Sequence, residues 1–146
     1  MKYDKNLLNE YEGFTCWKEM LKTCGASLIV NNYITASYLE VIIASVIKHG
    51  PYFVVAEQVA IAHSDINLDN IKKTGVSWNI LKKPCQIGDI NPKAVKYLII
   101  LATTNGVEHL GFLKKFSQVF LDEAKRTEFY QIQTKEQLII FLEKHF

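Results

Sequence analysis

The strongest constraint on the fold is a run of six consecutive apolar residues at positions 97–102. Both faces of such a strand avoid water, so we expect it at the centre of a sheet that other layers cover on each side. Shorter apolar runs at 52–56 and 59–62 predict two more strands, and alternating apolar and polar residues predict a half-buried strand at 75–81. The sequence therefore indicates a small mixed sheet with both faces covered.

A helical pattern precedes these strands. Apolar residues recur at helical spacing in 17–28, where Thr15 is the expected N-cap and Gly25 is a weak point or an early stop. A second helix follows and ends at Gly50-Pro51, because proline cannot continue it. The candidates for its N-cap are Thr35 and Ser37.

Further helices are expected after the long apolar strand. Segment 82–92 reads as turn-rich, and a short strand is expected near 9–14. The expected C-terminal helices are 108–120, 122–129 and 135–145, the last with Thr134 and Gln137 at capping-box spacing. Helices on either side of a strand-rich middle predict a three-layer α/β/α fold, a single α/β domain over residues 1–146 with a small mixed sheet flanked by helices.

Composition excludes several classes of protein. The 146 residues carry a net charge of +2, the lysines are scattered, and Arg126 is the sole arginine, so nucleic-acid binding is not expected. No apolar stretch reaches the roughly 18 residues that cross a bilayer, and residues 1–6 do not lead into a signal sequence, so we expect no direct membrane insertion. Three cysteines without motif spacing indicate free thiols in a reducing, cytoplasmic compartment, with Cys16 and Cys24 as small core residues.

Two of the four histidines stand out by their position. His63 follows the apolar strand 59–62 directly, at the kind of sheet edge where open α/β folds bind ligands, although a lone histidine there is more often structural. His109 falls in the first helical turn after the central strand, where free backbone N–H groups favour an anion. His49 is expected to be structural, since it meets the negative end of its helix, and His145 is given no role.

The two histidines can share one crevice only if their strands end at the same edge of the sheet. Two imidazoles without a third metal ligand favour phosphoryl or proton transfer over zinc chemistry. Asp65 could supply that third ligand, which leaves a metal-dependent hydrolase using His63, Asp65 and His109 as an alternative. The sequence has no Gly-rich phosphate loop, G-x-S-x-G elbow or H-E-x-x-H motif that would decide the matter.

Several segments together resemble one known family. They are 34–50 leading into Gly50-Pro51-Tyr52-Phe53-Val54, then Val59-Ala60-Ile61-Ala62-His63, Lys72-Lys73-Thr74-Gly75-Val76-Ser77, and 98–109 ending on a histidine 46 positions after His63. In this order they are similar to the enzyme IIA domains of the bacterial phosphoenolpyruvate-dependent sugar phosphotransferase system. The likeness is to the mannitol/fructose-type fold and, within it, most to the ascorbate-type subgroup.

The resemblance implies a function and a role for each site residue. His63 would be the phosphorylated nucleophile, which accepts phosphate from the histidine phosphocarrier protein and passes it to a cysteine of enzyme IIB, for ascorbate or a related sugar. His109 would stabilise the phosphoryl oxygens. Apart from the resemblance, the hydroxyl of Ser64 is expected to support the phosphoryl group with a hydrogen bond that compensates for the charge of Asp65. The membrane enzyme IIC would be an indirect partner, and no metal, nucleotide or other cofactor is implied.

The chain also departs from the family's pattern. Ala62 stands where the family usually has proline, and Ser64-Asp65-Ile66 replaces a small residue followed by arginine and proline. The arginine of the mannitol-type second helix has no counterpart. These differences keep open an alternative, a regulatory binding module of the same fold. For a carrier, we expect Asp65 to turn away from the phosphoryl group and cap the segment from Asn67.

Overall fold

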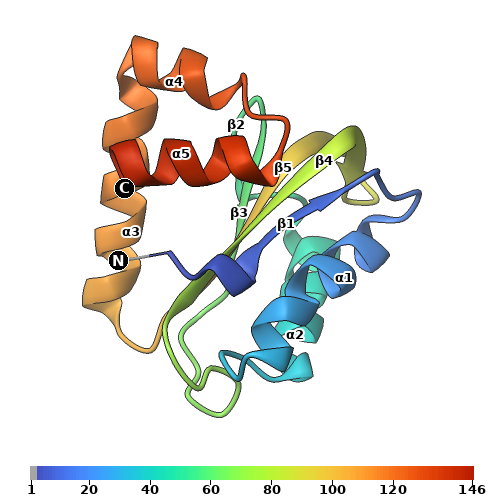
Figure 1. Ribbon diagram of the computed structural model, residues 1–146. Coiled ribbons are helices and arrows are strands. Elements are labelled where there is room, and N and C mark those ends of the chain that lie inside the picture. Colours follow the sequence, from blue (N-terminus) through green and yellow to red (C-terminus); the bar gives the residue numbers. More distant parts are fainter. Residues whose placement is uncertain (1–2) are drawn as a thin grey trace.

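The computed structural model describes residues 3–146, which form one mixed sheet with helices on both faces (Figure 1). The first two residues of the predicted domain lie outside this range. The strands are β1 (Leu8–Tyr11), β2 (Val54–Ala56), β3 (Gln58–Ala62), β4 (Gly75–Ile87) and β5 (Lys93–Ala102). The α-helices are α1 (Trp17–Val30), α2 (Ala36–His49), α3 (Gly106–Leu121), α4 (Glu123–Phe129) and α5 (Lys135–His145), and a short 3-10 helix, Lys5–Leu7, precedes β1.

The sheet has the order β1-β4-β5-β3-β2, so the apolar strand β5 is central as predicted. β5 runs antiparallel to β4 and parallel to β3, while β1 is parallel to β4 and β2 is antiparallel to β3. Helices α1 and α2 cover one face, and α3, α4 and α5 cover the other (Figure 1). The predicted three-layer α/β/α architecture is therefore confirmed.

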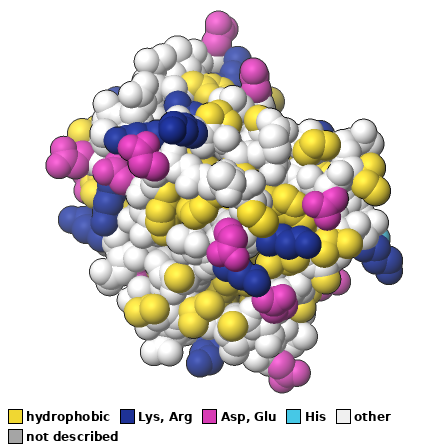
Figure 2. Space-filling model, turned by 90° about the vertical axis from the view of Figure 1, so that its right-hand side faces the viewer, with side chains coloured by type: hydrophobic (Ala, Val, Ile, Leu, Met, Phe, Trp, Pro, Cys, Tyr) yellow, Lys and Arg dark blue, Asp and Glu magenta, His cyan; other side chains and the backbone are white. Residues whose placement is uncertain are grey.

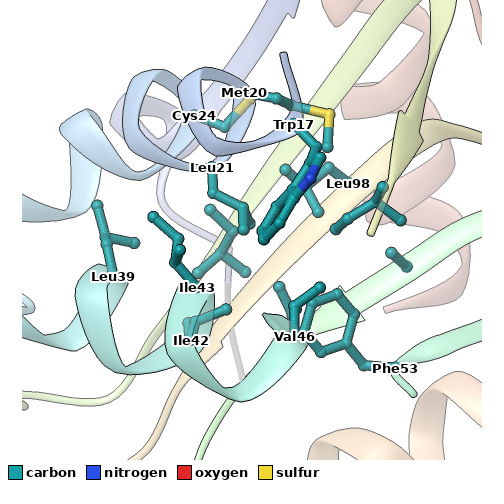
Figure 3. Close-up of a cluster of buried hydrophobic side chains, with 14 of the residues drawn as sticks. Trp17, Met20, Leu21, Cys24, Leu39, Ile42, Ile43, Val46, Phe53 and Leu98 are labelled. Atoms are coloured by element: carbon teal, nitrogen blue, oxygen red, sulfur yellow. The ribbon is translucent and has the colours of Figure 1, made fainter. Parts of the chain in front are cut away.

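The core under α1 and α2 is aliphatic with a few aromatic rings. Figure 3 shows part of this cluster of buried side chains: Trp17, Met20, Leu21, Cys24, Leu39, Ile42, Ile43, Val46, Phe53 and Leu98. A Cβ atom added to Gly25 would lie 2.5 Å from both methyl carbons of Leu39, so this glycine lets α1 and α2 approach closely. Gly25 does not stop the helix, because α1 continues to Val30.

The core under α3, α4 and α5 is richer in aromatic rings. Tyr97 of β5 packs its ring centroid 4.7 Å from that of Phe129, and Phe116 stacks on Phe120 at 4.5 Å. The phenol of Tyr97 also donates a hydrogen bond of 2.8 Å to the carbonyl oxygen of Ile132 in the loop before α5. The capping box of Thr134 and Gln137, predicted from spacing, then starts α5.

Several local expectations need correction. Residues 82–87 are strand rather than turn, because β4 pairs Cys85–Ile87 with the start of β5 after a register shift that follows Ile80. The N-cap of α1 is Cys16 rather than Thr15, and Cys16 is exposed, whereas Cys24 and Cys85 are buried. The segment 52–53 is a turn, so β2 is shorter than predicted. Throughout residues 3–146, no helix combines the length and the apolar character that a bilayer crossing requires.

Candidate functional site

The topology brings His63 and His109 to the same edge of the sheet. β3 and β5 are parallel neighbours, with Ala62 opposite Ile100, so both strands leave the sheet in the same direction. His63 follows the end of β3, and His109 lies in the first turn of α3, which begins four residues after β5 ends. Their ring centroids are 5.2 Å apart, with an angle of 65° between the ring planes. The condition under which the two histidines can share one crevice is therefore met.

The ring of His63 is oriented by a backbone carbonyl. Its Nδ1 lies 2.6 Å from the carbonyl oxygen of Ile61. A carbonyl oxygen can only accept a hydrogen bond, so Nδ1 carries a proton and donates it. In the neutral imidazole, Nε2 then holds the free lone pair and is the nucleophilic nitrogen. The ring is half-buried and lines a cleft.

His109 is held by its helix and by a threonine. The Asn105 side chain caps α3 by accepting a 2.9 Å hydrogen bond from the backbone N–H of Glu108, and its amide donates to the Glu108 carboxylate at 2.6 Å. The hydroxyl of Thr103 lies 3.2 Å from His109 Nδ1. Partial burial lowers the pKa of His109, and the neighbouring His63 lowers that pKa further. The pKa shift favours a neutral imidazole at neutral pH.

The peptide group that joins His63 to Ser64 is bound on both sides by tyrosines. The phenol of Tyr52 donates a 2.8 Å hydrogen bond to the carbonyl oxygen of His63. The N–H of Ser64 donates at 3.2 Å to the phenol of Tyr38, which in turn donates at 2.7 Å to the carbonyl oxygen of Leu101. Neither tyrosine was predicted as a site residue. Tyr38 resembles an ordinary core residue of a helical stripe, and Tyr52 was assigned to a strand.

The histidines open onto a cleft of about 520 Å³. Its lining residues are Ser45, His49, Tyr52, His63, Ser64, Asp65, Ile66, Gly106, His109 and Leu110. His49 therefore belongs to the cleft, although its place at a helix end suggested a purely structural role. Within residues 3–146, this lining contains histidine but no lysine or arginine, and its one carboxylate is that of Asp65.

Asp65 lies differently from the sequence-based expectation. It is exposed and lines the cleft. The cap at the following turn comes from Asn67, whose side chain accepts a 2.9 Å hydrogen bond from the N–H of Asp69. The expectation that Asp65 caps this segment is wrong, because Asn67 makes the cap. Over residues 3–146, no group of three or more His, Cys, Asp or Glu side chains is placed to hold a metal ion, so His63, Asp65 and His109 do not form the ligand set of the hydrolase alternative.

The fold and the paired imidazoles define an α/β protein whose cleft presents one nucleophilic nitrogen beside a second, helix-borne histidine. The family model described as "Phosphoenolpyruvate-dependent sugar phosphotransferase system, EIIA 2" matches residues 3–145. The chain therefore belongs to this family of phosphotransferase-system proteins, as the resemblance indicated.

The curated relatives are named for two different substrates, mannitol and ascorbate. The mannitol-specific cryptic phosphotransferase enzyme IIA component of Escherichia coli (strain K12) is 28% identical over 122 residues, which cover 84% of this chain and 82% of that protein. The ascorbate-specific EIIA component of Mycoplasma pneumoniae is 34% identical over 93 residues, which cover 64% of this chain and 57% of that protein.

Solved structures share the fold. The solution structure of the mannitol-specific cryptic enzyme IIA from Escherichia coli superimposes with a TM-score of 0.85 at 24% identity, covering 97% of this chain and 95% of that one. An Escherichia coli complex of mannitol enzyme IIA with phosphorylated enzyme IIB contains a chain that superimposes with a TM-score of 0.77 at 17% identity and 98% coverage of both chains.

Proposed function

We propose that this protein, as one enzyme IIA domain over residues 1–146, is a cytoplasmic phosphoryl carrier of a sugar phosphotransferase system. His63 accepts a phosphoryl group from the histidine phosphocarrier protein and passes it to enzyme IIB, and so indirectly supplies the membrane enzyme IIC. The observation that supports this most is the 2.6 Å bond from His63 Nδ1 to the carbonyl oxygen of Ile61, which in the neutral ring leaves the lone pair on Nε2, in a cleft that also contains His109. Membership of the family supports the same role.

The transfer needs only groups that the cleft and its partners supply. The Nε2 lone pair of His63 attacks phosphorus, a new N–P bond forms, and the donor's N–P bond breaks with its electrons returning to the donor imidazole. Delivery to the thiolate of enzyme IIB repeats this exchange with an S–P bond. Such a step depends on in-line positioning and charge stabilisation, so no cofactor takes part in the proposed step.

His109 is proposed to stabilise the transferred group. If the hydroxyl of Thr103 donates to Nδ1 of His109, the proton of the neutral ring lies on Nε2. That N–H can then donate to a phosphoryl oxygen on His63, whose ring lies 5.2 Å away between centroids. Ser64 lines the same cleft and is proposed to add a hydroxyl donor. The N-terminus of α3, represented in the lining by Gly106, adds a partial positive charge.

The surroundings of the cleft suit protein partners. Ile66 and Leu110 line it while 40% and 68% exposed, and Val107 beside them is 83% exposed. Exposed apolar side chains around a reactive centre favour protein docking over long-range steering. Figure 2, which views another side of the molecule, shows positive and negative side chains interspersed among apolar ones, as expected for a net charge of +2. Ascorbate or a related sugar is proposed as the transported substrate, on the likeness to the Mycoplasma relative.

The test is phosphorylation by the purified donor chain. The protein is incubated with phosphoenolpyruvate, enzyme I and the histidine phosphocarrier protein, and its intact mass is followed. We expect an acid-labile gain of one phosphate that is absent in His63→Ala and present in a His145→Gln control, whose imidazole pairs with Glu128 instead. A gain that persists in His63→Ala would contradict the assignment. Addition of enzyme IIB should discharge the wild-type phosphoprotein.

A regulatory module of the same fold is the second candidate. The observation that favours it is Asp65 on the cleft lining, because a carboxylate near the phosphoryl position opposes a second negative charge. A protein that binds the phosphocarrier protein, and becomes phosphorylated, but transfers nothing to any enzyme IIB of its organism would support this role. Rapid discharge to enzyme IIB would support the carrier.

A further inference from the structure

The backbone immediately after His63 is held in an unusual way. β3 ends at Ala62, so the His63–Ser64 peptide lies outside the regular hydrogen-bond ladder. Both of its polar groups are nevertheless bonded, and both partners are phenols from outside β3. Tyr52, in the turn after α2, binds the carbonyl of His63, and Tyr38, in α2, binds the N–H of Ser64.

Each phenol is itself fixed by a second bond. The hydroxyl of Ser45 donates to the Tyr52 oxygen at 3.2 Å, so the Tyr52 proton remains directed at the carbonyl of His63. Tyr38 is buried, and its proton is directed at the carbonyl of Leu101 near the end of β5. Burial raises the pKa of Tyr38 to about 12, so this phenol keeps its proton at neutral pH. Two hydrogen-bond chains therefore converge on one peptide.

We propose that Tyr38 and Tyr52 form a clamp on the His63–Ser64 peptide and act as positioning residues for His63. The clamp fixes the backbone turn from which the ring reaches back to the carbonyl of Ile61, and so selects Nε2 as the nitrogen that faces the cleft. This proposal deepens the proposed function, because it names what sets the acceptor nitrogen.

The two bonds of the clamp have separable roles. The Tyr52 bond is at the exposed side of the peptide, where loss of the hydroxyl leaves the carbonyl of His63 accessible to water. The Tyr38 bond is part of a buried pair, so its loss would leave the Ser64 N–H and the Leu101 carbonyl without their partner. Tyr52→Phe is therefore the cleaner variant, and Tyr38→Phe the more severe one.

The clamp is tested by measuring which ring nitrogen of His63 carries the proton. Nitrogen-15 NMR distinguishes a protonated from an unprotonated ring nitrogen, and it requires no phosphorylation. We expect His63 of the wild type to show a protonated Nδ1 and an unprotonated Nε2, and Tyr52→Phe to show averaging toward both tautomers. Tyr33→Phe is the matched control, since it also removes one phenolic hydrogen bond, of 2.7 Å to Asp4, outside the cleft lining. Ser45→Ala should give a smaller change of the same kind.

Phosphorylation supplies a second readout. We expect Tyr52→Phe to accept phosphate about 10-fold or more slowly at unchanged thermal stability, because small displacements of a reacting group cost up to about 100-fold in rate. The phosphohistidine of the wild type should be the Nε2 form by phosphorus-31 NMR, with the Nδ1 form appearing in Tyr52→Phe and Tyr38→Phe. Wild-type ring shifts in Tyr52→Phe, together with an unchanged rate, would overturn the clamp. Absence of phosphate on wild-type His63 would instead overturn the proposed function, while the ring shifts still decide the clamp.

Discussion

His63 and His109 face each other across one cleft, but the two regions that present them are built differently. His109 lies on a helix whose start, cap and hydroxyl partner all come from residues 103–109. His63 lies in a segment without regular structure, and its backbone is held by Tyr38 and Tyr52 from 11 or more positions earlier in the chain. The first region is therefore local in sequence, whereas the second depends on tertiary contacts.

The difference predicts which perturbations each histidine tolerates. A capped helix keeps its first turn in place through several backbone hydrogen bonds, so single side-chain changes around His109 should act mainly through the imidazole itself. The segment around His63 is held by few hydrogen bonds, so the loss of any one of them should disturb its conformation more. Substitution of single side chains around His109 and around His63 tests this contrast.

The largest effect is expected from His109→Ala. Loss of one donor to the phosphoryl oxygens commonly lowers a rate by about 10²–10³-fold, so loading and discharge should both slow by this factor while His63 remains the acceptor. Quench-flow with radiolabelled phosphoenolpyruvate measures both steps. His49→Ala serves as the comparison, since it removes another imidazole from the cleft lining. Equal rates for wild type and His109→Ala would remove His109 from the proposed mechanism.

A smaller effect is expected from Asn105→Ala. The variant loses the cap of α3, which should lower the free energy of unfolding by about 1 kcal/mol in urea titrations. Transfer should fall only a few-fold, because the remainder of α3 still packs through Phe112 and Phe116. Asn105→Ser keeps a capping oxygen and should restore most of the loss. A decrease in the phosphoryl-transfer rate as large as that expected for His109→Ala would show that the first turn of α3 depends on the Asn105 cap for its position.

Asp65→Asn should act on the His63 side with a modest effect. The carboxylate lines the cleft but is exposed, so its repulsion of a phosphoryl group is partly screened by water and salt. We expect a few-fold shift toward the phosphoprotein at equilibrium with the phosphocarrier protein, which shrinks as salt is raised. Asp69→Asn, outside the lining, is the control. A shift that is absent at low salt would place the charge too far from His63 to matter.

The smallest effect is the pH dependence that His109 adds to stability. Because its folded pKa lies below the ordinary value of about 6.5, the unfolded chain takes up this proton first as the pH falls. The contribution is present above about pH 6.5 and is lost as the pH falls through the folded pKa. Urea midpoints of wild type should therefore decline more than those of His109→Gln between about pH 7 and about pH 5. The opposite sign would mean that folding favours the charged imidazole.

The local character of the His109 region also explains what the sequence revealed. The apolar strand and the helical spacing after it identified β5 and α3, and the parallel arrangement of β3 and β5 then brought the two histidines together. Segment 82–87 was missed because Lys82-Lys83-Pro84 lacks apolar character, although these exposed residues lie within a long strand. This segment is a strand because it pairs with β5, and the residue types alone do not reveal that pairing.

His49 and the two tyrosines, which were not predicted as site residues, lie in α2 or in the turn after it. A histidine at the C-terminal end of a helix is explained by its favourable interaction with the helix dipole, so nothing in the sequence indicated that His49 lies in the cleft. The position of His49 in the cleft follows from the three-dimensional arrangement of α2 and the Gly50-Pro51 turn. Tyr38 has the spacing of a core residue and is indeed buried, but its hydroxyl performs a second task that periodicity cannot show. Asp65 was expected to avoid the cleft because a carboxylate would repel a phosphoryl group. No feature of the sequence around Asp65 supported that expectation.

The end of β5 has a dynamic consequence for the pair. Leu101 is bonded through Tyr38 to the peptide after His63, and Thr103, two residues later, contacts the ring of His109. The contacts that hold the two histidines therefore meet within three consecutive residues, at the end of β5 and the residue that follows it. We therefore expect a displacement of this segment to carry both rings with it, so that the distance between the rings changes less than the distance from either ring to an incoming partner.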